Sequence, residues 1–145
     1  MCFNSGMNET ATPTAAVLVI GNEILSGRTQ DSNLNMIARK LASVGIRLAE
    51  ARVVPDIEDE IVEAVNSLRE RYTYIFTTGG IGPTHDDITA DSIAKAFGIR
   101  AVENVEARAR LIAYYTPTNI NEARLRMARV PEGAALMPLG FSADP

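Results

Sequence analysis

The stretch "TTGGIGPTHDD" (77–87) places three glycines and two adjacent aspartates between an apolar run and a segment with helical patterning. Glycines at such a turn remove side chains and expose backbone N–H groups. N–H groups at the start of a helix suit a phosphate or another anion. We therefore expect a phosphate-binding loop, with a tight turn that binds nothing as the alternative. The expected ligand-binding residues are Gly79, Gly80, Gly82 and Thr84.

Asp86 and Asp87 close this loop. Carboxylates beside a phosphate are favourable when a divalent cation lies between the two groups, and Mg²⁺ accepts one or two carboxylates plus phosphate oxygens. Asp86 and Asp87 are therefore the predicted ligands of a Mg²⁺ cofactor. An aspartate before a helix also caps its first N–H groups or interacts with its dipole. We expect one of the two to cap the helix and the other to face the ligand.

An earlier loop, "GNEILSGRTQDSN" (21–33), carries a similar density of polar groups. Glu23 and Asp31 are candidates to orient a substrate or a metal-bound water, and Ser26 and Asn33 are candidate ligand contacts. The alternative is a solvated loop that supplies one helix cap, because mixed-charge loops are common on protein surfaces. The residues alone leave both interpretations open.

The segments that must position these loops alternate between two hydrophobic patterns. Short, β-branched apolar runs predict strands at 15–21, 46–54 and 72–78. Apolar residues at helical spacing predict a helix after each strand. This order predicts an α/β fold of three layers, with a mainly parallel sheet and helices on both faces. Ligands bind such sheets at the carboxyl ends of the strands, from which both polar loops leave.

Capping residues predict where the helices begin. Asp31 or Ser32 is expected to begin the first helix and Asp56 the second. Val44 and Ile57 are expected in the buried stripes of these two helices. Beyond Gly98 the patterns predict a short strand at 99–103, a helix at 105–115 capped by Asn104, and a helix at 121–130.

The chain has 145 residues, enough for one domain, which we place at 15–145 after a disordered polar tail at 1–14. The net charge of −4 and the pI near 5.0 argue against nucleic acid as a partner, because phosphate backbones attract basic surfaces. A membrane is not expected either, since no apolar run approaches the roughly 20 residues that span one. Cys2 is the only cysteine, which excludes an intrachain disulfide and a cysteine metal cluster and indicates the cytoplasm.

Three stretches together resemble a known family. They are "GNEILSGRTQDSNLNMIARKLASVGI", "VVPD" and "TTGGIGPTHDDITADSIAKAFG". They are similar to the molybdopterin-binding domain family, which includes MogA, MoaB, the gephyrin G domain, part of MoeA and the N-terminal domain of CinA proteins. The "GNEILSG" loop looks closest to the CinA-type branch. The resemblance covers about residues 17–131 and implies a mainly parallel α/β fold in a homo-oligomer, with a trimer favoured.

The resemblance also implies residue roles. Asp56 and Asp87 match two aspartates that matter in MogA-like domains, and Asp31 resembles the acidic residue before the first helix. All three are therefore expected catalytic residues. The three glycines match the phosphate-binding turn, whereas Ile81 stands where MogA-like loops carry threonine.

Three functions follow from the resemblance. MogA-like members activate molybdopterin by adenylylation with Mg-ATP, so the leading expectation is a domain of molybdenum cofactor biosynthesis that binds a pterin phosphate or nucleotide with Mg²⁺. CinA-type relatives are associated with cleavage of nucleotide pyrophosphates such as ADP-ribose, which is the first alternative. The second alternative is a non-catalytic binding or assembly module. Family domains continue past "VPEGAALM" into another strand and a glycine-proline loop that "PLGFSADP" lacks, so we expect a truncated domain and a pocket left incomplete or completed by another subunit.

Overall fold

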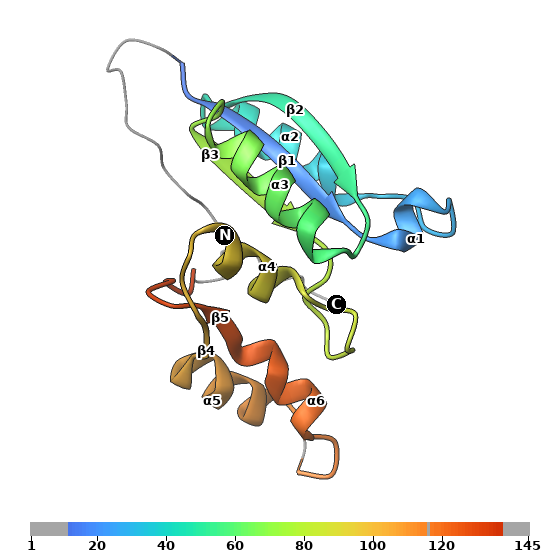
Figure 1. Ribbon diagram of the computed structural model, residues 1–145, viewed down its shortest axis with the longest axis vertical. Coiled ribbons are helices and arrows are strands. Elements are labelled where there is room, and N and C mark those ends of the chain that lie inside the picture. The colour runs from blue at the N-terminus through green and yellow to red at the C-terminus, as the bar shows by residue number, and fades with distance from the viewer. Residues whose placement is uncertain (1–11, 116, 138–145) are drawn as a thin grey trace.

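The computed structural model describes residues 12–115 and 117–137, and strands and helices alternate in it as predicted (Figure 1). The elements are β1 (Thr14–Ile20), α1 (Asn22–Leu25), α2 (Asn33–Ser43), β2 (Arg47–Val54), α3 (Glu58–Arg69), β3 (Tyr74–Thr78), α4 (Thr89–Ala96), β4 (Ala101–Glu103), α5 (Val105–Tyr114), α6 (Glu122–Leu125), the 3-10 helix η1 (Arg126–Ala128) and β5 (Arg129–Pro131). We call β1–β3 with α2–α4 the sheet unit, and β4, β5, α5, α6 and η1 the C-terminal unit.

A parallel sheet in the order β2-β1-β3 forms the centre of the sheet unit. The central strand β1 is buried along its whole length apart from its first residue. A strand buried on both faces has apolar residues at every position, which explains the continuous run "AAVLVI". Because β2 and β3 lie on opposite sides of β1, the strand order reverses beside β1. That reversal is the point at which open α/β sheets bind ligands.

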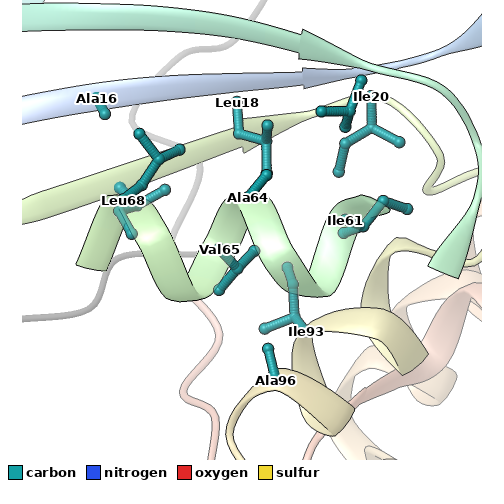
Figure 2. Close-up of a cluster of buried hydrophobic side chains, with 11 residues drawn as sticks. Ala16, Leu18, Ile20, Ile61, Ala64, Val65, Leu68, Ile93 and Ala96 are labelled. Carbon is teal, nitrogen blue, oxygen red and sulfur yellow. The ribbon is translucent and has the colours of Figure 1, made fainter. Parts of the chain in front are cut away.

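One face of the sheet packs on α3, and α4 packs on the far side of α3 (Figure 2). Alternate residues of β1 point toward α3, as the period of two in a strand requires. Burying a Leu or Ile side chain contributes about 1.5–3 kcal/mol, so this cluster holds the sheet rigid. The cluster consists of Ala16, Leu18, Ile20, Val54, Ile61, Ala64, Val65, Leu68, Ile75, Ile93 and Ala96.

The opposite face of the sheet is covered by α2, which lies behind the sheet in Figure 1 and packs against β2. Leu41 is the buried residue of this helix, and Leu34 is half-buried. The sheet unit is therefore the predicted three-layer α/β arrangement. Two residues that we expected in buried helical stripes are exposed instead. Val44 is 58% exposed because it follows the last residue of α2, and Ile57 is 52% exposed because it precedes the first turn of α3.

The C-terminal unit lies on the other side of α4 from the sheet (Figure 1). Its strands β4 and β5 pair antiparallel, with Val102 opposite Val130. Asn104 caps α5 as predicted, because its side-chain oxygen accepts a hydrogen bond of 2.9 Å from the N–H of Ala107. The helices α5 and α6 pack against η1, and β5 packs against α4.

The predicted helix at 121–130 is wrong beyond η1. Asn121 begins α6, because its side chain accepts a hydrogen bond of 2.9 Å from the N–H of Arg124. The chain then leaves the helix after Ala128, whose carbonyl accepts a bond of 2.9 Å from the N–H of Asn104. Pairing with β4 therefore replaces the end of the helix at β5, and the helical spacing of apolar residues at 121–130 does not indicate this pairing.

The N-terminal boundary of the domain differs slightly from the prediction. The first strand begins at Thr14, inside the predicted tail, and Pro13 already accepts a backbone hydrogen bond of 3.0 Å from Arg47. Residues 1–11 of that tail, and the C-terminal segment 138–145 predicted to be cut short, lie outside the described residues. Among the helices of 12–115 and 117–137, none has the length and apolar character to cross a membrane.

Candidate functional site

The loops after β1, β2 and β3 meet at the carboxyl end of the sheet. Gly79 (φ +88°) turns directly against β1, and a Cβ there would overlap the carbonyl oxygen of Ile20. Gly80 (φ +60°) follows in the same left-handed region. A Cβ on Gly80 would overlap the Thr89 hydroxyl and lie 3.5 Å from Asp56 Oδ1. Glycine tolerates both this φ and this close approach, so both glycines are required by the backbone itself.

Thr89 holds the far end of the glycine loop, and the sequence analysis missed it. Its side chain is buried, its hydroxyl donates to the carbonyl of Gly79 (2.9 Å), and its N–H donates to the carbonyl of Gly80 (3.1 Å). These bonds satisfy two carbonyls of the turn and fix its shape. The available signal was a threonine at the first turn of a helix, a position from which the hydroxyl bonds nearby backbone.

The prediction that Asp56 caps α3 is wrong. The residue that precedes that helix is Ile57, which makes no side-chain cap. Instead, Asp56 Oδ2 accepts a hydrogen bond of 2.9 Å from the N–H of Asn22, the first residue of α1. That N–H has no partner within its own helix, so the carboxylate satisfies it and ties the loop after β2 to the loop after β1. Asp56 thus lies beside both Asn22 and Gly80, at the switch point of the sheet.

Asp87 turns back into the glycine loop instead of capping α4. Its Oδ2 accepts hydrogen bonds from the Thr84 hydroxyl (2.6 Å) and the Thr84 N–H (2.8 Å). Burial raises the pKa of Asp87, whereas these bonds and a further one from the N–H of Gly82 lower it. The charge of Arg126 lowers the pKa further, and the net value lies below the ordinary one. A ligand phosphate at the N–H groups of Gly82 and Thr84 would therefore compete with this carboxylate.

Neither aspartate of the pair caps α4, because Ile88 precedes that helix without a side-chain cap. Asp86 lies at the surface, where its Oδ1 is 3.0 Å from His85 Nε2 and the two side chains are 72% and 87% exposed. Residues 12–115 and 117–137 contain no group of three or more His, Cys, Asp or Glu side chains that could hold a metal ion. Mg²⁺ needs only one or two carboxylates when phosphate oxygens complete its shell. Asp87 lines the cavity beside the glycine loop and Asp86 does not, so Asp87 fits that role better.

The first polar loop is more ordered than a solvated loop, because it contains the unpredicted helix α1. The Glu23 carboxylate folds back over Gly21, 2.6 Å from where a Cβ of that glycine would lie. The Ser26 hydroxyl donates to the Glu23 carbonyl (3.2 Å) and accepts from Arg28 Nε (3.1 Å). Glu23 and Ser26 therefore stabilise this loop, while Asn33 lies exposed at the start of α2.

Asp31 caps the helix that follows it, as expected from its position before α2. Its Oδ1 accepts a hydrogen bond of 2.7 Å from the N–H of Leu34 in α2. It lines a shallow depression between α2 and β2 together with Asn35 and Glu50. The structure does not place it in the cavity beside the glycine loop, which Asp87 lines.

A cavity of about 610 Å³ opens between the glycine loop with α4 on one side and the C-terminal unit on the other. Gly80, Gly82 and Asp87 form part of its polar rim. Most of the remaining wall is apolar, and three arginines interrupt it. The apolar wall includes Ile81, Ile93, Leu111, Met127, Val130 and Leu136. The arginines are Arg110, Arg126 and Arg129.

Sequence reasoning missed this second wall of the site. The segments "ARARLIAYY" and "ARLRMARV" mix arginines with apolar residues, which is also the pattern of a helix face packed on a core. The pattern alone does not show that α5 and η1 face the glycine loop across a cavity, because that placement depends on how the C-terminal unit packs on α4.

Comparison with known proteins decides the family of this chain. A family model described as "Probable molybdopterin binding domain" matches residues 16–137. The chain belongs to the molybdopterin-binding domain family. The domain is 38% identical over 128 residues to a protein of Pyrobaculum calidifontis, a match that covers 87% of this chain and 49% of the relative. It is 42% identical over 123 residues to a protein of Saccharolobus islandicus, covering 83% and 47%. The chain thus spans about half the length of these relatives.

Solved structures confirm the resemblance to CinA and to MoaB-type domains. The crystal structure of CinA from Thermoplasma acidophilum, a protein described as having unknown function, is 34% identical with a TM-score of 0.77 and covers 83% of this chain and 72% of that one. MoaB from Pyrococcus furiosus, described as a tungsten cofactor synthesizing protein, is 25% identical with a TM-score of 0.56, covering 71% and 64%. MoaB from Thermus thermophilus shares the fold at 20% identity and a TM-score of 0.55, covering 78% and 70%.

Proposed function

We propose that this domain binds a pterin phosphate or a nucleotide together with Mg²⁺, in molybdenum cofactor biosynthesis. The observation that carries the proposal is the cavity of about 610 Å³ beside the glycine loop. Pockets for small molecules have volumes of about 300–1,000 Å³, mostly apolar walls and a few polar groups that fix orientation. Here the apolar walls suit a flat ring, and the rim of Gly80, Gly82 and Asp87 suits a phosphate with its cation.

The residues of the rim would bind different parts of the ligand and its cation. Gly80 and Gly82 leave room for a phosphate to approach the backbone, because neither carries a side chain. Asp87 is the carboxylate that would hold Mg²⁺, because it is the predicted metal ligand that lines the cavity. When bound, Mg²⁺ would neutralise charge on the phosphate oxygens. Asp56, fixed by the N–H of Asn22, lies beside Gly80 and does not line the cavity, so it would act only on a part of the ligand that reaches past Gly80 toward the sheet.

A calorimetric titration with molybdopterin, in the presence and absence of Mg²⁺, tests the proposal. We expect binding that requires Mg²⁺ and that weakens at least tenfold in Asp87→Asn, since a neutral amide is a poor Mg²⁺ ligand. Asp31→Asn is the matched control, because Asp31 lines a different depression. Absence of binding by a folded sample, with molybdopterin and with its adenylylated form, would contradict the proposal.

A second candidate function is hydrolysis of a nucleotide diphosphate such as ADP-ribose. The likeness to CinA, with a TM-score of 0.77, favours it as the branch that the first loop already resembles. Asp87 would hold the cation beside the diphosphate, and Asp56 would position a water. Release of AMP from ADP-ribose, abolished in Asp87→Asn, is the expected result. A folded sample that releases no AMP would remove this candidate.

A non-catalytic binding or assembly module remains the third candidate, and a cytoplasmic homo-oligomer is part of the proposal, with a trimer favoured. Within the described sheet, β3 pairs only with β1, so its second edge is available for pairing. Such an edge favours association with another strand. Sedimentation equilibrium is expected to show an oligomer, and a concentration-independent monomer would contradict this part.

A further inference from the structure

The three arginines of the cavity wall differ in their partners. Arg129 pairs with Asp91, which also lines the cavity, at 2.6 Å. Arg110 pairs with Glu106 one turn earlier on α5, at 2.5 Å. Both charges are therefore balanced within the protein. Among residues 12–115 and 117–137, Arg126 has no carboxylate within the 4.0 Å of an ion pair.

Arg126 is also the arginine whose charge reaches the glycine loop. Its positive charge lowers the pKa of Asp87, the carboxylate of the rim that accepts hydrogen bonds from the glycine loop. Asp87 Oδ2 accepts its hydrogen bonds from Thr84 and not from Arg126, so the two charges face the same cavity without forming an ion pair. The Arg126 side chain is exposed, so its guanidinium can donate to an anionic group that enters the cavity without breaking an ion pair within the described residues.

The position of Arg126 restricts what can enter. It projects from η1, which follows α6 and precedes β5, so a residue of the C-terminal unit faces the glycine loop of the sheet unit. Met127 and Leu111 lie beside it on the same wall, and Ile81 and Ile93 lie on the wall of the sheet unit. A ligand that contacts both walls would place an apolar ring between them and an anionic group at the guanidinium.

We propose that Arg126 binds an anionic group of the ligand, a phosphate or a carboxylate, and thereby selects phosphorylated over unphosphorylated ligands. The inference rests on the proposed function, because it assigns a residue of the same cavity. A guanidinium offers two parallel N–H donors to a phosphate, a geometry that an ammonium does not reproduce. Since Asp87 already occupies N–H groups of the glycine loop, Arg126 is the donor in the cavity that a ligand anion reaches without displacing a carboxylate.

The test compares two probes, molybdopterin and a pterin of the same ring system without the phosphate, each titrated with Mg²⁺ present. We expect Arg126→Gln to weaken molybdopterin binding about 10- to 100-fold, the range of a charge-assisted hydrogen bond, and to leave the unphosphorylated pterin unchanged. Arg126→Lys is expected to recover part of the loss. Arg108→Gln is the matched control, because Arg108 lies on α5, pairs with Glu103 and does not line the cavity.

The outcomes separate the two proposals. If the unmodified protein binds molybdopterin and Arg126→Gln binds it equally well, the role of Arg126 is wrong while the proposed function stands. Equal losses for both probes would also overturn it, because they indicate a general distortion of the cavity. If the unmodified protein binds neither probe, the proposed function itself fails.

Discussion

The sheet unit and the C-terminal unit contribute to one cavity but are packed differently. In the sheet unit, six of the seven residues of β1 are buried, and α3 buries Ile61, Ala64, Val65 and Leu68. In the C-terminal unit, α5 and α6 have no buried residue, and the exposed side chains of α5 include Val105 (82%) and Tyr114 (81%). The comparison indicates a rigid wall that carries the glycine loop and a less buried wall that carries the arginines. Local stability is lower where few apolar contacts are buried.

The largest expected effect tests this difference in packing. Leu18→Ala removes a fully buried side chain between β1 and α3, and we expect it to lower the free energy of unfolding by about 2–5 kcal/mol. Leu111→Ala changes a half-buried side chain of α5, and we expect a loss below about 1.5 kcal/mol. Urea unfolding followed by circular dichroism measures both. Similar losses in the two variants would show that the units do not differ in packing.

A second prediction concerns the backbone of the glycine loop. Gly79→Ala places a Cβ in overlap with the Ile20 carbonyl at a φ of +88°, and we expect a loss of at least about 3 kcal/mol from strain and overpacking together. Gly133→Ala is the matched control, because Gly133 has a φ of +82° but no atom within 4 Å of the added Cβ. Its expected loss is about 1–2 kcal/mol. Equal melting temperatures of the two variants would show that Gly79 is not held against β1.

A smaller effect is expected at Glu50 on β2. Its carboxylate accepts hydrogen bonds from Tyr72 (2.7 Å), Arg52 (2.7 Å) and Arg71 (3.1 Å), and the bonds from Tyr72 and Arg52 lower its pKa despite partial burial. A lowered pKa stabilises the fold above the ordinary value of 4.5, and this contribution is lost as the pH falls through the lowered pKa. Glu50→Gln is therefore expected to cost about 1 kcal/mol at pH 7.

The pH dependence of this difference is the critical part of the measurement. Chemical denaturation at pH 7 and below pH 4 is expected to show the gap between Glu50→Gln and the unmodified protein shrinking in acid. Glu63→Gln serves as a control, because Glu63 lies exposed on the neighbouring helix α3. A gap that stays constant with pH would indicate a loss of packing rather than of charge.

The smallest expected effect concerns Asp87 in the absence of ligand. Because its pKa is lowered, the ionised carboxylate stabilises the glycine loop above the ordinary value of 3.8, and the contribution disappears as the pH falls through the lowered pKa. Asp87→Asn is expected to lower stability at pH 7 by less than about 1 kcal/mol, since the loop lies near the surface. Amide hydrogen exchange at Thr84 is expected to rise in this variant. Unchanged exchange would show that Asp87 does not hold the loop.

The sequence predicted what depends on local pattern. The strands β1 to β4, the helices of the sheet unit and the cap at Asn104 follow from hydrophobic periodicity and from residues within one turn of each other. The meeting of the loops near Asp56 and Gly80 was also predictable, because carboxyl ends of parallel strands share one edge of a sheet. These predictions need no knowledge of distant contacts.

The rest depends on competition between partners that the sequence does not rank. Asp56 lies at a position from which it could cap α3, but its carboxylate accepts a hydrogen bond from the N–H of Asn22, which is 34 residues away in the sequence. Asp87 lies at a position from which it could cap α4, but its carboxylate accepts hydrogen bonds from Thr84 in the loop before it. The strand β5 replaces the end of a predicted helix because it pairs with β4, and Arg126 faces the cavity because of that fold.

The most direct test of the central claim is a map of backbone amide chemical shifts while molybdopterin and Mg²⁺ are added to the ¹⁵N-labelled protein. Binding in the cavity predicts the largest changes on both of its walls, at Gly80 and Gly82 in the glycine loop and at Ala107 and Met127 in the C-terminal unit. Changes confined to the depression around Asn35 and Glu50, between α2 and β2, would contradict the claim that the glycine loop and the C-terminal unit together form the ligand site.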